Sequence, residues 1–137
     1  MKIFDAEWAA TLAKMAANDA TFQKKAKKFK YVYQYVVKPN PDKGVDEGYE
    51  FWIRFPEAVE FGTGKHAKPD FTMTTSYQVF HDILTGKSNA IKALTTRKAF
   101  VSGSLPTLLR FTGAINRIVE LMQEIPAEGA GEFEDIT

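Results

Sequence analysis

The spacing of apolar residues predicts two helices and then a strand at the start of the chain. Asp5 can cap a first helix, on which Trp8 begins an apolar face. Asn18 and Asp19 interrupt this helix and start a second, shorter one. Residues 30–37 are dense in aromatic and β-branched side chains, which is typical of a strand.

The middle of the chain predicts a strand meander that leads into a helix. Residues 49–55 alternate between apolar and polar side chains, the pattern of a half-buried antiparallel strand. Two more short strands are expected over residues 58–61 and 70–74, with a loop rich in turn residues between them. Thr75 and Gln78 have the spacing of a capping box, which indicates the start of a helix.

The last third of the chain predicts a short helix, a strand and a long helix. Ser88 is expected to cap the short helix, and residues 98–103 have the composition of a final strand that can pair through a crossover. From Pro106 onward, apolar residues repeat at spacings of three and four, which predicts one amphipathic helix that ends near Ile125. Residues 126–137 are Gly-rich and acidic and are expected to form a flexible tail.

This order of elements predicts an α+β domain with a mostly antiparallel five-stranded sheet that about five helices cover. Residues 1–125 suffice for a single domain with one core. The composition, with 45% hydrophobic and 26% charged residues, is ordinary for a soluble globular protein. The first residues lack the apolar run of a secretory signal, so we expect a cytoplasmic location.

Charge and residue types argue against several classes of function. A formal net charge of +1 gives no overall field that would attract nucleic acid. The sequence has no Cys, and neither His66 nor His81 has a second ligand at a metal-binding interval, so no metal site is expected. Motifs for a serine nucleophile, a phosphate loop or a dinucleotide are also missing. We therefore expect a protein that is not an enzyme and needs no cofactor.

The second half of the chain carries a resemblance to a known family. An Asp-led strand, residues 70–74, enters a helix that the turn of residues 85–87 closes, and residues 100–104 supply a strand, a Gly and the start of the last helix. Over residues 69–122 this arrangement resembles the sterol carrier protein 2-like family of lipid-binding domains. The first half resembles the family in the order of its elements and at Trp8, Asn18 and Phe22.

The resemblance implies an apolar cavity between the sheet and the helices, with the last helix as a wall or a movable lid. Such a cavity would bind a fatty acid, acyl-CoA, sterol or isoprenoid without covalent chemistry, and the protein would transfer or present it. The residues expected to line the cavity are Phe51, Ile53, Phe80, Leu84, Leu108, Phe111, Thr112, Ile115, Val119 and Met122. The same spacing also describes a solid core, and the Thr112 hydroxyl could instead bond back to a helix carbonyl.

Two basic clusters have both a functional and a plain interpretation. Lys65, His66 and Lys68 lie in a Gly-rich loop and could meet a polar head group, or they could belong to a solvated loop. The lysines of residues 24–30 could touch an anionic membrane, or they could form a solvated helix face.

Two rival functions remain open from the sequence. The apolar face of the last helix could dock a partner protein or form a homodimer. The chain could also act as an accessory protein of a lipid-modifying enzyme. The sequence does not fix the oligomeric state.

Overall fold

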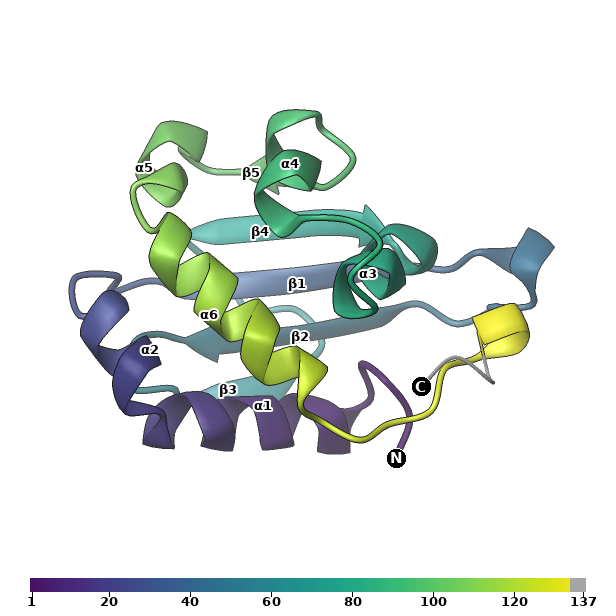
Figure 1. The fold of residues 1–137 in the computed structure, drawn as a ribbon, viewed down its shortest axis with the longest axis horizontal. Helices are drawn as coiled ribbons and strands as arrows, with labels where there is room; N and C mark the ends of the chain where they lie inside the picture. Colours follow the sequence, from purple (N-terminus) through teal and green to yellow (C-terminus); the bar gives the residue numbers. More distant parts are fainter. Residues whose placement is uncertain (134–137) are drawn as a thin grey trace.

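A computed structural model describes residues 1–133, in which helices pack against one side and one edge of a single sheet (Figure 1). The α-helices are α1 (Ala6–Asn18), α2 (Ala20–Lys25), α3 (Tyr77–Leu84), α4 (Ala90–Thr95), α5 (Leu105–Leu109) and α6 (Thr112–Gln123), with short 3-10 turns at η1 (Pro41–Lys43) and η2 (Gly131–Phe133). The strands are β1 (Val32–Lys38), β2 (Tyr49–Arg54), β3 (Phe61–Thr63), β4 (Phe71–Ser76) and β5 (Phe100–Ser102). No helix within residues 1–133 is both long and apolar enough to cross a membrane.

The sheet has the strand order β3-β2-β1-β4-β5, and only the pair of β1 and β4 is parallel. Tyr35 of β1 stands opposite Phe51 of antiparallel β2 and next to Met73 of parallel β4. The last strand, β5, pairs antiparallel with its neighbour β4 after a connection through α3 and α4, so the crossover predicted for this strand is wrong. The predicted α+β class and the mostly antiparallel five-stranded sheet are confirmed.

Side-chain caps start the first two helices where the sequence predicts them. The Asp5 carboxylate accepts a hydrogen bond from the backbone N–H of Trp8 at 2.8 Å. The Asp19 carboxylate accepts one from the N–H of Phe22 at 2.7 Å. Both bonds satisfy amide groups that the first turn of a helix leaves without a partner.

One predicted strand lies further along the chain than expected. The prediction placed it at residues 58–61, but β3 begins at Phe61. The chain turns before that point, because the N–H of Ala58 donates to the Arg54 carbonyl at 3.0 Å. Ala58 also has a φ of 57°, which an extended strand does not allow.

Two helix caps differ by one residue from their predicted positions. Ser76, not Thr75, caps α3 by accepting the N–H of Val79 at 3.2 Å. Thr75 remains in β4, where its buried hydroxyl donates to the Lys98 carbonyl at 3.1 Å. In the same way, Asn89 rather than the predicted Ser88 caps α4.

The single long helix predicted from Pro106 to Ile125 is divided into α5 and α6. Phe111 has φ −106° and ψ 31°, which takes the backbone out of the helical region. The Thr112 hydroxyl then donates to the Leu109 carbonyl at 2.7 Å. The break leaves α6 as a separate rod that crosses the helix-bearing side of the sheet obliquely (Figure 1).

Residues 126–133 differ from the predicted flexible tail, because they pack against the rest of the fold. Glu128 pairs with Lys2 in an isolated parallel bridge, and the Ala130 N–H donates to the Tyr77 hydroxyl at 3.0 Å. Phe133 is buried, with its ring centroid 4.7 Å from that of His81. The rest of the predicted tail, residues 134–137, lies outside the described residues.

Candidate functional site

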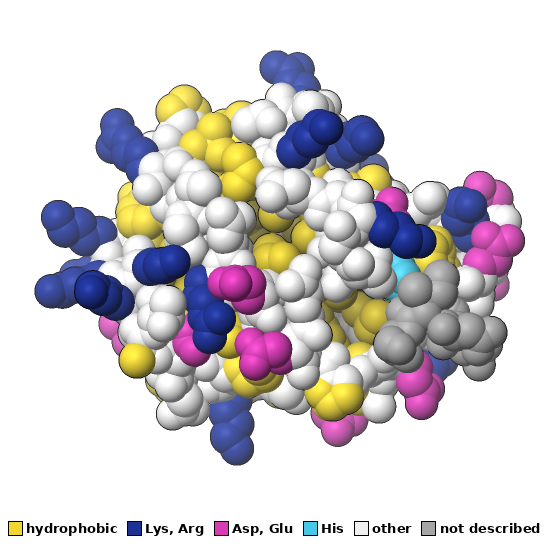
Figure 2. All heavy atoms as spheres, viewed as in Figure 1, with side chains coloured by type: hydrophobic (Ala, Val, Ile, Leu, Met, Phe, Trp, Pro, Cys, Tyr) yellow, Lys and Arg dark blue, Asp and Glu magenta, His cyan; other side chains and the backbone are white. Residues whose placement is uncertain are grey.

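An apolar pocket of about 70 Å³ lies between the sheet and the layer of α4, α5 and α6. Apolar side chains are visible in the hollow between α4 and α6 (Figure 2). The lining residues are Phe22, Phe29, Tyr33, Tyr35, Phe55, Met73, Phe80, Ala90, Leu94, Ala99, Leu108, Phe111, Ala114, Ile115, Ile118, Val119 and Met122. A lining of this kind favours an apolar ligand.

The floor of the pocket comes from side chains that share one face of the sheet. Successive residues of a strand point to opposite sides, so Tyr33 and Tyr35 of β1 face the helices together. Met73 stands beside Tyr35 on the neighbouring strand β4. The centre of the sheet therefore supplies two aromatic rings and a flexible thioether to one site.

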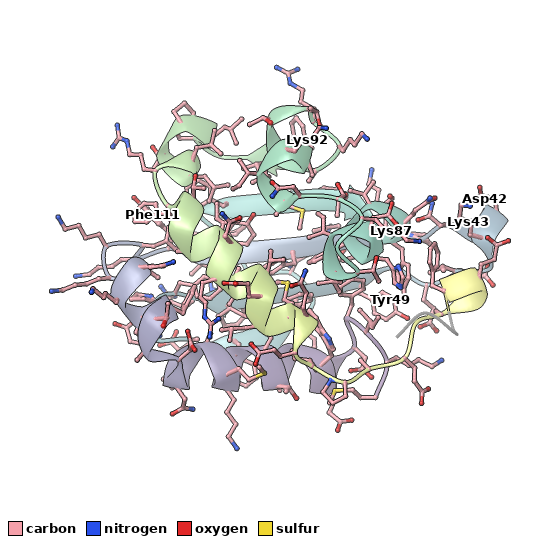
Figure 3. The ribbon with its side chains drawn as sticks, viewed as in Figure 1. Asp42, Lys43, Tyr49, Lys87, Lys92 and Phe111 are labelled. Atoms are coloured by element: carbon pink, nitrogen blue, oxygen red, sulfur yellow. The ribbon has the colours of Figure 1, made fainter. Side chains whose placement is uncertain are left out.

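The roof of the pocket is α6, which polar side chains hold in place at its middle and at its end. Near the middle, the Arg117 guanidinium donates to both Asp19 carboxylate oxygens, at 2.9 and 2.7 Å. At the end, the Gln123 amide donates to the Ile83 carbonyl at 3.1 Å. Phe111 stands where α5 meets α6 (Figure 3), with its ring centroid 4.9 Å from that of Phe29.

No charged side chain lines the pocket within residues 1–133. Lys92 is exposed and lies on the outer side of α4 (Figure 3). Burial raises the pKa of both Tyr33 and Tyr35, so these two phenols stay protonated at neutral pH. The pocket can therefore offer O–H groups and apolar surface, but no ion pair.

The structure brings six of the ten predicted lining residues to this pocket and keeps four away from it. The six are Phe80, Leu108, Phe111, Ile115, Val119 and Met122. Phe51 and Ile53 face the helices but are fully buried, and the Phe51 ring stacks at 4.5 Å against that of its cross-strand neighbour Tyr35. Leu84 lines a separate surface groove near α1, and the Thr112 hydroxyl bonds back to its own helix.

The loop cluster of Lys65, His66 and Lys68 lies on the opposite side of the sheet from the pocket. The His66 ring lies 4.6 Å from that of Trp52, which alternates with the inward-facing Phe51 and Ile53 on β2. The His66 N–H donates to the Gln34 side-chain oxygen at 2.8 Å, and Gln34 alternates with Tyr33 and Tyr35. The prediction that this cluster meets the polar end of a pocket ligand therefore differs from the observed arrangement.

The lysines of residues 24–30 are exposed on α2 and the turn that follows it. Their contact with an anionic membrane stays a prediction. No group of three or more potential metal ligands is found within residues 1–133.

Sequence reasoning missed much of the pocket floor. Tyr33 and Tyr35 are predicted as strand residues, but the strand could have faced either way. The available signal was their alternation with Gln34, because a polar residue between two aromatic ones marks the outward side. Phe22 and Phe29 also line the pocket, and the periodicity of a helix does not separate core residues from lining residues.

The family comparison covers most of the chain. Residues 11–116 match the model of the SCP-2 sterol transfer family. A comparison with curated proteins finds no matching sequence.

Solved structures with this fold share little sequence identity with the chain. A crystal structure of sterol carrier protein 2 superposes with a TM-score of 0.81 at 17% identity, covering 91% of this chain and 100% of the other. A conserved hypothetical protein from Thermus thermophilus, described as possibly a sterol carrier protein, gives a TM-score of 0.80 at 18% identity, with 93% and 92% covered. A palmitated sterol carrier-like protein from Aedes aegypti gives 0.55 at 17% identity, with 90% and 96% covered. At these identities the likeness establishes the fold alone.

Proposed function

The chain belongs to the SCP-2 sterol transfer family, and from that premise we propose that it binds a lipid-like ligand non-covalently in the pocket beneath α6. The protein would then carry or present that ligand. The observation that carries the proposal is the lining, which is mostly apolar and includes no charged side chain within residues 1–133.

The energy of burying an alkyl chain is sufficient for this function. A sixteen-carbon chain gains roughly 12 kcal/mol on leaving water, and association costs at least about 4 kcal/mol. The remainder corresponds to a dissociation constant of about 1 μM without any charged partner. A pocket that lacks ion pairs is therefore compatible with useful affinity.

The size of the pocket implies that α6 moves when a ligand binds. Its volume of about 70 Å³ is well below the roughly 300–1,000 Å³ of pockets that hold drug-sized ligands. The sheet does not deform easily, because each strand is hydrogen-bonded to its neighbours through the backbone. The separate rod α6, with its break at Phe111, is the element that can open the pocket.

The lining argues against one rival function, the homodimer, and against catalysis. Phe111 and Ile115, which a homodimer would use, are partly buried against the core of their own chain. A pocket without a paired acid and base offers no route for proton transfer. We therefore assign the protein a binding role, and its accessory role beside an enzyme remains the alternative that co-purification would reveal.

The first experiment is native mass spectrometry of the protein as purified, followed by solvent extraction of the bound molecule. We expect a stoichiometric adduct of lipid mass. Ile115→Trp places a large ring in the pocket and should reduce the adduct, whereas Asn116→Trp adds the same ring to the exposed side of α6 and should not.

The proposal would be contradicted by a protein that carries no adduct as purified and also does not bind added fatty acids, acyl-CoA, sterols or isoprenoids. A mass of two chains that Phe111→Asp reduces to one would instead support the homodimer.

A further inference from the structure

Two tyrosines stand side by side in the floor of the apolar pocket. Tyr33 and Tyr35 have ring centroids 4.7 Å apart, and both are buried. Side chains of a strand stand roughly perpendicular to the sheet, so the hydroxyl ends of both rings project toward the helix layer. The Tyr33 group also contributes to the raised pKa of Tyr35, which is consistent with two hydroxyls close together.

Neither hydroxyl has a hydrogen-bond partner within residues 1–133. By contrast, the Tyr77 hydroxyl accepts the N–H of Ala130 at 3.0 Å. The fully buried side-chain polar atoms without a partner in this part of the chain are the two nitrogens of His81. The Tyr33 and Tyr35 hydroxyls are not among them, so they keep some accessible surface, and both residues line the pocket. A buried phenol without a partner costs free energy that a ligand oxygen would recover.

The lack of charged side chains in the lining limits which kind of ligand oxygen can bind beside the tyrosines. No Lys, Arg or His lines the pocket within the described residues. A carboxylate or phosphate placed beside the tyrosines would lose its hydration without gaining a counter-ion, which is strongly unfavourable. A neutral hydroxyl, ketone or ester oxygen needs only hydrogen bonds.

We propose that the Tyr33 and Tyr35 hydroxyls form a polar anchor inside the pocket that selects lipids bearing a neutral oxygen. The inference rests on the proposed function of the same pocket and narrows it. It places a long-chain alcohol, ketone or ester at this site in preference to a hydrocarbon or a free fatty-acid anion.

A competition between two ligands that differ in one oxygen tests the anchor. The full-length protein is equilibrated with equal amounts of hexadecanol and hexadecane, separated from unbound ligand, extracted, and analysed by gas chromatography. The ratio of bound alcohol to bound alkane should fall about fivefold in Tyr33→Phe or Tyr35→Phe, the loss of one neutral hydrogen bond. Comparing ratios between variants cancels the different solubilities of the two ligands.

Tyr31→Phe is the matched control, because Tyr31 precedes the same strand but does not line the pocket. Its ratio should equal that of the wild type. An unchanged ratio in both Tyr33→Phe and Tyr35→Phe, with both ligands still bound, would overturn the anchor and leave the proposed function standing. Palmitate that outcompetes hexadecanol at neutral pH would overturn the preference for a neutral oxygen. If the wild type binds neither hexadecanol nor hexadecane, the anchor is overturned, and the native mass spectrometry with fatty acids, acyl-CoA, sterols and isoprenoids decides separately whether the proposed function stands.

Discussion

At the scale of single residues, Asp19 connects the start of one helix to the roof of the pocket. Its carboxylate caps α2 and also binds the Arg117 side chain of α6, which lies 98 positions later in the sequence. The hydrogen bond from Arg117 is the main reason that the pKa of Asp19 is lowered from 3.8 to about 2. A folded-state pKa below the unfolded value means that ionised Asp19 stabilises the fold.

Substitution of Asp19 should separate the cap from the ion pair. Asp19→Ala loses both and should lower the free energy of unfolding by at least about 1 kcal/mol, the usual value of a cap. Asp19→Asn keeps a capping oxygen and should lose less at neutral pH. The difference in free energy of unfolding between Asp19→Asn and the wild type should be full above pH 3.8 and should disappear as the pH falls through about 2. Urea unfolding over that range measures this, and a deficit that does not vary with pH would contradict the assignment.

Individual residues also show how far sequence alone predicts the site. Ile115, Val119 and Met122, which the sequence predicts on one helix face, all line the pocket, and their contact with a ligand stays a prediction. Phe51 is one of the alternating apolar residues of β2, yet it is fully buried, with its ring 4.5 Å from that of Tyr35 and 5.8 Å from that of Trp8 on α1. Which residues line the pocket depends on how the strands and helices pack together, and the periodicity of one segment carries no information about that packing.

At the scale of elements, α6 differs from the strands that it covers. β1 is bonded on both sides, to β2 and to β4, whereas α6 is fixed by side-chain packing and a few polar contacts. The break before α6 was not predicted, because the apolar repeat continues through it. The backbone leaves the helix at Phe111 without any change in the pattern of apolar residues.

Hydrogen exchange should therefore report the movement of α6. In lipid-free protein, the amides of α6 should exchange faster than those of β1, and they should become protected when ligand is loaded. The amides of α1 serve as the control, since α1 does not line the pocket and its protection should not change. Equal protection of α6 with and without ligand would show that the pocket opens in another way.

At the scale of the whole molecule, the two ends of the described chain are held together. The segment before Phe133 runs beside the N-terminal residues, and the N–H of Ile3 donates to the Glu128 carbonyl at 3.0 Å. The composition of this segment, rich in Gly and Glu, predicted mobility. The segment is held by the buried Phe133 ring together with the Ala130–Tyr77 hydrogen bond and the Lys2–Glu128 bridge, and composition carries no information about such contacts.

Phe133→Ala tests whether this segment belongs to the cooperative fold. Phe133 packs 5.3 Å from the Tyr77 ring and 4.7 Å from the His81 ring, measured between centroids. Its truncation should lower the free energy of unfolding by about 3 kcal/mol, as for other buried aromatic residues. Phe100→Ala removes an equally large but exposed ring and should change it by less than about 0.5 kcal/mol. Equal effects in urea denaturation would show that the segment unfolds on its own.

The apolar lining of the pocket has a consequence for how such a site can change over time. A site made of Leu, Ile, Val, Met and Phe side chains depends on their combined volume and shape more than on their identity. Exchanges among these residues can therefore accumulate one at a time, each reshaping the cavity without abolishing it. A fold that is shared at 17% identity agrees with such drift. The two tyrosine hydroxyls differ from the rest of the lining. If either oxygen is lost, no apolar side chain can replace its hydrogen bond.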